Sequence, residues 1–285
     1  TVGGGALSHY EPYKAKVEKL TGKPIETLED PSIPTAAKIE FAENYARDRH
    51  VVKYKPEYAA KEHLMMHELV HLQFACEARN EGVNKLFVST QEQKSNFIKA
   101  HEKWITKASR KGIPEQTIAT VIGELFDGLN RQIFNCPVDL FIEHYLHDEH
   151  PDLRPVQFLS LSAIVAEGLK AVTNKEVEKN TPSDVLENSK ILNMVGAMQF
   201  KELYGVDSLE KYQASTSEMN KANMLYSQFN EMKNKRSPGD EYFLVDQWAR
   251  ELGLAGNFKL LDEREFVSGR ERQNAGSKSE EEKHA

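Results

Sequence analysis

The chain has 285 residues, and its 44 acidic and 37 basic side chains give a formal net charge of −7 with histidine neutral. This acidic balance argues against partners that need a basic footprint, namely nucleic acid and anionic membrane surfaces. No run of apolar residues approaches the roughly 18 that a membrane span requires, and no secretory signal is visible. We therefore expect a cytoplasmic protein in which Cys76 and Cys136 are reduced, buried thiols.

The N-terminal part of the chain combines helical and extended patterns. Glu11–Thr21 has helical periodicity, whereas the three prolines of Lys23–Pro34 predict a loop. Lys38–Ala42 and His50–Lys55 are short and rich in β-branched and aromatic residues, which predicts two strands. We interpret His50–Lys55 as an edge strand that directly precedes a long helix.

Helical spacing dominates the chain after Pro56. Gly82 is expected to end the first helix of this region, and Asn135-Cys136-Pro137 to end one helix and begin the next, with Pro137 at its first position. The predicted helices are Glu57–Arg79, Thr90–Ser109, Glu115–Phe134, Pro137 to about Leu146, Val156–Thr173, Pro182–Leu203, Ser208–Lys233 and Asp240–Leu252.

These patterns predict a mainly α (α+β) fold with a small N-terminal sheet and a helical C-terminal half. We divide the chain into a lead-in and loop (1–34), a core that contains the sheet (35–150) and a helical subdomain packed on that core (151–267). The remaining segment (268–285) is polar and lacks large apolar residues, which is typical of disorder.

The strongest chemical signal is the pentapeptide His67-Glu68-Leu69-Val70-His71, an HExxH motif. Two histidines four residues apart lie on one face of a helix, so that both Nε2 atoms reach one Zn²⁺ at about 2.0–2.1 Å. Glu68 hangs beside the metal, where it accepts a proton from metal-bound water as a general base. The two intervening residues are bulky and apolar, as the buried back of such a helix requires. His63 adds a third rung to the histidine ladder, but successive turns are about 5.4 Å apart, which predicts a supporting or surface residue.

Over Lys38–Phe74 the sequence resembles the zincin superfamily of metallopeptidases; beyond this stretch the likeness to uncharacterised bacterial zincins is only general. The resemblance implies a zincin-like fold, in which the helix with the two histidines packs under a small sheet whose edge strand holds an extended peptide substrate. It implies one Zn²⁺ per chain, His67 and His71 as ligands, and Glu68 as the base of a zinc-dependent peptidase.

A hydrolytic zinc keeps three protein ligands, and the sequence leaves the third one open. The HExxHxxGxxH extension is absent, so we expect a distant ligand, as in gluzincins, where a later helix supplies a glutamate. Glu143 is our first choice, because Asp139 lies one turn before it and could orient a ligand histidine. The alternatives are Glu124, which stands alone in an apolar run, then Glu77, and then His144 or His147.

Two functions remain open at this point. The first is gluzincin-like hydrolysis of peptide or other amide bonds, with a peptide or protein as substrate. The second is a non-catalytic helical protein that binds or regulates a partner and carries a structural or vestigial zinc site. Glu68 favours the first, because a structural site needs no base. The oligomeric state does not follow from the sequence.

Overall fold

The N-terminal sheet has three strands, β1 (Ile25–Glu29), β2 (Ala37–Glu40) and β3 (His50–Tyr54). Their order is β1-β3-β2, with β1 parallel and β2 antiparallel to β3. The prediction of His50–Lys55 as an edge strand is therefore wrong: β3 is central and mostly buried, as its β-branched residues require. The predicted loop Lys23–Pro34 is also wrong in part, because its prolines flank β1 and leave the strand free to pair.

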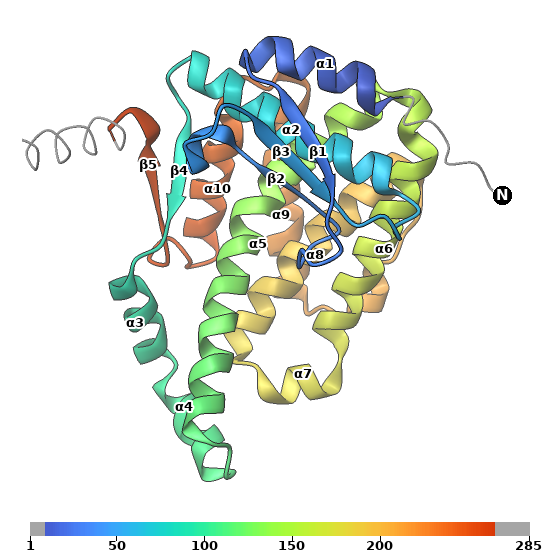
Figure 1. The fold of residues 1–285 in the computed structure, drawn as a ribbon. Helices are drawn as coiled ribbons and strands as arrows, with labels where there is room; N and C mark the ends of the chain where they lie inside the picture. Colours follow the sequence, from blue (N-terminus) through green and yellow to red (C-terminus); the bar gives the residue numbers. More distant parts are fainter. Residues whose placement is uncertain (1–8, 266–285) are drawn as a thin grey trace, which may run out of the picture.

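The structure is a computed structural model that describes residues 9–265. Helices make up most of it and surround the central helix α5 (Figure 1). The predicted lead-in and polar tail lie largely or wholly outside the described residues. The helices are α1 (Tyr10–Thr21), α2 (Lys61–Asn80), α3 (Gln91–Ala100), α4 (Glu102–Arg110), α5 (Glu115–Glu149), α6 (Arg154–Thr173), α7 (Lys175–Asn180), α8 (Ser183–Tyr204), α9 (Thr216–Met232) and α10 (Asp240–Glu251). Four 3₁₀ turns, Ala42–Tyr45, Pro151–Leu153, Leu209–Tyr212 and Lys233–Lys235, join them, and β4 (Lys85–Val88) pairs with β5 (Lys259–Asp262). The expectation of a mainly helical chain with a small sheet is confirmed.

The central helix α5 runs through Pro137 for 35 residues, so the predicted stop and restart at Asn135–Pro137 is wrong. A proline inside a helix costs about 3 kcal/mol, because it removes one backbone hydrogen bond and crowds the preceding turn. Here Pro137 is buried, and α5 packs against α2, α8 and α10 along its length. Tertiary packing therefore holds the helix through the proline and carries it on past Asp139 and Glu143.

Helix α2 packs against β2, β3, α1 and α5, which places it between the sheet and the central helix. Leu69 and Val70 are fully buried, as expected for the back of this helix. One hydrophobic cluster extends from Tyr10 to Phe258 and so includes residues from both sides of position 150. The histidine face of α2 is thus held rigidly against α5.

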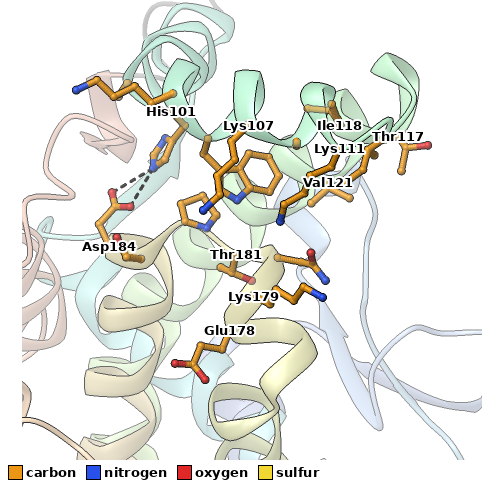
Figure 2. A pocket seen from close by; sticks show the side chains of 18 residues that line it. His101, Lys107, Lys111, Thr117, Ile118, Val121, Glu178, Lys179, Thr181 and Asp184 are labelled. Atoms are coloured by element: carbon orange, nitrogen blue, oxygen red, sulfur yellow. Dashed lines mark hydrogen bonds and ion pairs between the residues drawn. The ribbon is translucent and has the colours of Figure 1, made fainter.

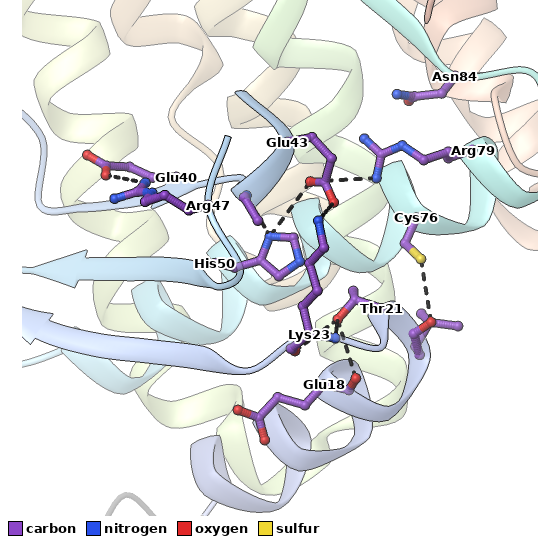
Figure 3. A network of polar contacts seen from close by, with 12 residues as sticks. Glu18, Thr21, Lys23, Glu40, Glu43, Arg47, His50, Cys76, Arg79 and Asn84 are labelled. Atoms are coloured by element: carbon purple, nitrogen blue, oxygen red, sulfur yellow. Dashed lines mark hydrogen bonds and ion pairs between the residues drawn. The ribbon is translucent and has the colours of Figure 1, made fainter. Parts of the chain in front are cut away.

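A polar network fixes the start of β3 against the end of α2 (Figure 3). The buried His50 accepts a hydrogen bond at Nδ1 from the backbone of Ala42, and burial lowers its pKa, which keeps the ring neutral. Glu43 bonds Lys23 and lies 3.9 Å from Arg79 of α2. Both cysteines are free thiols, as predicted, but only Cys76 is buried, whereas Cys136 is half-buried.

Helix α6 packs along α8 and diverges from α5 (Figure 1). Pro151–Thr173, which contains it, is long and apolar enough to cross a membrane by length and composition, although one such helix is weak evidence. Leu159 and Ile164 on α6 are more than half exposed. Its buried Gln157 reaches back to α5, where it donates to Glu143.

Candidate metal centre

The two motif histidines lie one turn apart on the face of α2 that meets α5. His67 Nε2 and His71 Nε2 are 3.1 Å apart. Two imidazole nitrogens at this distance repel through their lone pairs unless a proton or a metal ion lies between them. The pair is therefore either joined by an N–H···N hydrogen bond or spaced to share a metal ion.

Asp139 of α5 completes a group of three donor atoms. Its Oδ1 lies 3.4 Å from His67 Nε2 and 3.3 Å from His71 Nε2, and the three atoms lie within 4.8 Å of one another. Asp139 Oδ1 is shielded from solvent, yet it receives no well-aligned hydrogen bond from the described residues. A buried carboxylate oxygen in this state calls for a cation.

The size of this triangle fits a tetrahedral zinc ion. Bonds of about 2.0–2.1 Å at tetrahedral angles separate neighbouring donor atoms by about 3.3–3.4 Å. The three observed separations are 3.1, 3.3 and 3.4 Å. Three protein donors leave a fourth position open, which is the arrangement of catalytic and not of closed structural zinc sites.

Glu143, expected as the third ligand, lies behind His67. It is 3% exposed, and its Oε1 accepts a 2.7 Å hydrogen bond from His67 Nδ1. Because Nδ1 carries the donated proton, the neutral ring presents the Nε2 lone pair to the cluster. The structure thus places the two carboxylates in the reverse of the expected arrangement: Asp139 faces the two Nε2 atoms, and Glu143 orients a histidine.

The other oxygen of Glu143 is fully used. Oε2 accepts hydrogen bonds from His63 Nε2 at 2.9 Å and from Gln157 Nε2 at 2.7 Å. Gln157 is in turn held by Tyr204, whose hydroxyl donates to its Oε1 at 2.7 Å. His63, Gln157 and Tyr204 therefore form a frame that holds Oε2 of Glu143, while Oε1 accepts from His67.

The charges of these groups reinforce one another. Burial acts to lower the pKa of His67, but the nearby charges of Asp139 and Glu143 and the hydrogen bond to Glu143 outweigh it and raise that pKa well above its usual value. The metal-free ring therefore holds a proton on both nitrogens, and a metal ion would displace the one on Nε2. Burial likewise acts to raise the pKa of both carboxyls, yet the histidines lower the pKa of Asp139 and, further, that of Glu143. Both carboxylates are therefore ionised at neutral pH.

The remaining ligand candidates lie outside the cluster. Glu124 is exposed on α5, and Glu77 bonds Gln73 and Arg236. His144 contacts Asn234, and His147 bonds Asp148. None of these four belongs to the donor group that the structure forms among its described residues.

Glu68 lies between α2 and the sheet. Its Oε2 accepts a 2.9 Å hydrogen bond from the backbone N–H of Ile39 in β2. In the antiparallel register Ile39 opposes Val52, and the bond from Lys55 to Ala36 places Ile39 at a position whose N–H points away from β3. Glu68 thus holds the outer edge of β2, and no hydrogen bond to its Oε1 is found among the described residues.

The sequence offers Tyr204 and the tract around Gln157 only as unproven candidates for oxyanion stabilisation, does not predict that they support Glu143, and leaves His63 undecided. The sequence does point to His63, because it precedes His67 by four residues and therefore lies on the same face of the helix. Gln157 and Tyr204 lie 14 and 61 positions beyond Glu143, on other helices, and carry no local signal.

A cavity of about 810 Å³ lies away from this cluster (Figure 2). Lys107 and Lys111 extend from α4 toward Thr181, and His101 bonds Asp184 at its rim. None of the cluster residues lines it.

Comparisons of the chain with protein-family models, curated proteins and solved structures find no match.

Proposed function

We propose that His67, His71 and Asp139 bind one Zn²⁺ per chain and that the protein hydrolyses peptide or other amide bonds. The observation that carries this proposal is the triangle of donor atoms, 3.1–3.4 Å on a side, next to a glutamate one residue from the first ligand. When bound, the ion supplies Lewis acidity at its open fourth position.

The residues of the chain have separate tasks in this reaction. Glu68 accepts the proton of the attacking water and delivers it to the leaving amine. Because Oε2 is held by Ile39, the carboxylate keeps one orientation and Oε1 receives the proton. Glu143 holds the His67 ring in the tautomer that binds metal, and Gln157 and His63 hold Glu143.

A zincin-like arrangement supports the peptide substrate. The helix with the motif packs against a small sheet, and its glutamate touches the antiparallel edge strand β2. An edge strand can pair with an extended peptide; in β2 the outward N–H of Ile39 is already held by Glu68, so pairing would use other backbone groups of this edge. We propose a cytoplasmic enzyme without nucleic-acid or membrane partners, in keeping with its acidic charge.

The alternative is a non-catalytic protein with a structural metal site. One observation favours it: the bond from Ile39 to Glu68 anchors β2 whether or not any reaction takes place. In that case Glu68 is a structural residue, and its replacement alters stability instead of turnover.

The substitution Glu68→Gln separates the two functions. It keeps the oxygen that accepts from Ile39 and removes the basic carboxylate. We expect one zinc per chain by elemental analysis, an unchanged melting temperature, and a loss of hydrolysis of a mixed peptide library of at least about 100-fold. Glu81→Gln, an exposed change just after α2, is the matched control. Undiminished hydrolysis in Glu68→Gln would remove the base from the mechanism.

A further inference from the structure

Two hollows border the metal cluster at different residues. The first, about 320 Å³, lies between α5, α6 and α8 and is lined by His67 and Asp139. The second, about 400 Å³, lies between α2, β4 and α10 and is lined by His71. The neighbours Val138 and Asp139 line different hollows. A ligand that fills both would therefore lie against donor residues of the cluster in each hollow.

The first hollow is apolar close to the cluster. Four aliphatic side chains, Leu140, Leu161, Val165 and Leu192, line it, and Ile164, 52% exposed, stands at its rim. Its polar lining includes Arg131, Gln132 and Asn135, which lie one to two turns of α5 before Asp139. A volume of about 320 Å³ is at the lower end for ligand pockets and suits one large apolar side chain with adjoining backbone.

The second hollow has aromatic walls, formed by Phe41, Phe74, Phe87 and Phe134. Its charged residues are already paired. Arg79 forms two hydrogen bonds with Glu263, and Glu241 bonds Arg236. This side of the cluster therefore also offers an apolar surface with no free charge of its own, apart from the cluster itself.

Neither hollow holds a charged group where a chain terminus would need one. Among the described residues, Arg131 is the lining cation for which no ion pair is found. It precedes Asp139 by eight residues, which is about 12 Å along the helix. An extended peptide covers that distance in three to four residues, so the backbone of Arg131 lies several substrate residues away from the donor triangle.

From this geometry we infer that the substrate is a polypeptide segment that crosses the cluster with one side chain in each hollow. This inference rests on the proposed function. The enzyme is then an endopeptidase that cuts internal bonds between apolar residues, and it does not trim residues from chain ends.

Gly196 of α8 offers a direct test of the first hollow. It lines this hollow, and a Cβ built at its position meets no atom within 4 Å, so that a larger side chain extends into open space. Gly196→Leu therefore fills the hollow without strain in the backbone. Gly128→Leu on α5 is the matched control, because Gly128 is equally open and lines neither hollow.

The experiment uses the full chain loaded with zinc and two sets of probes. One set consists of peptides with acetylated and amidated ends that vary the residues around one internal bond, and the other of free dipeptides and tripeptides. We expect cleavage of the blocked peptides between large apolar residues. Gly196→Leu should lower kcat/KM for them by at least about tenfold and shift the preference toward Gly and Ala, with zinc content unchanged. Gly128→Leu should match the parent chain.

Each other outcome has a distinct meaning. Trimming of free-ended peptides without cleavage of the blocked ones overturns the endopeptidase inference and leaves the proposed function standing. No zinc-dependent hydrolysis of either set contradicts the proposed function itself. An unchanged preference in Gly196→Leu shows that the first hollow binds no substrate side chain. If that variant does not fold, Ile164→Gln at the exposed rim replaces it, with the same expected loss of preference for large apolar residues.

Discussion

Two substitutions one turn apart on α5 test whether Asp139 or Glu143 is the third zinc ligand. Asp139→Asn removes the charged donor from the triangle, whereas Glu143→Gln acts only through His67. The 2.7 Å bond from His67 Nδ1 goes to a charged acceptor, and such a bond contributes about 1.5–3 kcal/mol. In Glu143→Gln a neutral amide oxygen takes over as acceptor, and a neutral bond contributes about 0.5–1.5 kcal/mol, so that about 1–1.5 kcal/mol is lost. This corresponds to a decrease of roughly 5–13-fold in zinc affinity, near the lower end of the 10–100-fold typical of groups behind a ligand histidine. Asp139→Asn should lower the zinc affinity by more than Glu143→Gln does.

The surroundings of Glu143 suggest that the glutamine variant folds. The new amide oxygen can still accept from His67, and its NH₂ group then faces His63 Nε2 and the NH₂ group of Gln157, so that Gln157 must turn its amide to accept there. Nδ1 of His63 has no partner among the described residues, so the ring can carry its proton there and accept from the amide at Nε2. Glu143→Ala instead leaves three buried donors unpaired, and we expect it to lower the free energy of unfolding by about 3–5 kcal/mol.

Zinc affinity is measured by competition with a chromophoric chelator, and Glu124→Gln serves as the control on the same helix. This control should bind zinc like the parent chain, since Glu124 is exposed. Thermal unfolding of each metal-free variant separates lost affinity from lost fold. A larger loss in Glu143→Gln than in Asp139→Asn would assign the third ligand to Glu143 after all, and an unchanged affinity in Asp139→Asn would refute the triangle.

Two further predictions concern stability. Zinc at 100 times its dissociation constant should stabilise the fold by about 2.7 kcal/mol, which raises the melting temperature by roughly 5–10 °C in a chain of this size; calorimetry with zinc and with a chelator should show this difference, and equal melting temperatures would contradict it. Glu40 is buried, and burial acts to raise its pKa, but Arg47 and two lysines lower it to about 2. Because the pKa of Glu40 is lower in the folded than in the unfolded chain, the ionised carboxylate stabilises the fold. This stabilisation is complete above the unfolded pKa of about 4.3 and is lost as the pH falls toward 2. Since its partners are partly exposed, we expect about 1–2 kcal/mol, seen as a flatter acid-unfolding curve for Glu40→Gln by circular dichroism.

The local part of the candidate site follows from the sequence. The spacing of His67 and His71 fixes their common face in any helix, and the structure brings their Nε2 atoms to 3.1 Å. The choice between Asp139 and Glu143 does not follow in the same way. Both lie on one face of α5 and differ by one turn, so the choice depends on the axial position of α5 relative to α2. Packing distributed over the whole core sets that distance, and no local pattern encodes it.

The errors in the fold have the same origin. Pro137 is a sound local signal for a helix end, but the packing of α5 overrides it. His101 divides the predicted helix Thr90–Ser109 because its ring bonds Phe97 O and Asp184 of α8. Gly82, in contrast, adopts φ +68° just after α2, as its purely local role predicts.

The most direct test of the account is a crystal structure of the zinc-loaded chain, with anomalous diffraction recorded on both sides of the zinc absorption edge. The account predicts one zinc peak per chain within about 2.0–2.2 Å of His67 Nε2, His71 Nε2 and a carboxylate oxygen of Asp139. Glu143 should remain on His67 Nδ1. A zinc-loaded chain whose anomalous peak lies elsewhere, or a chain that crystallises without any peak at this cluster despite excess zinc, would contradict it.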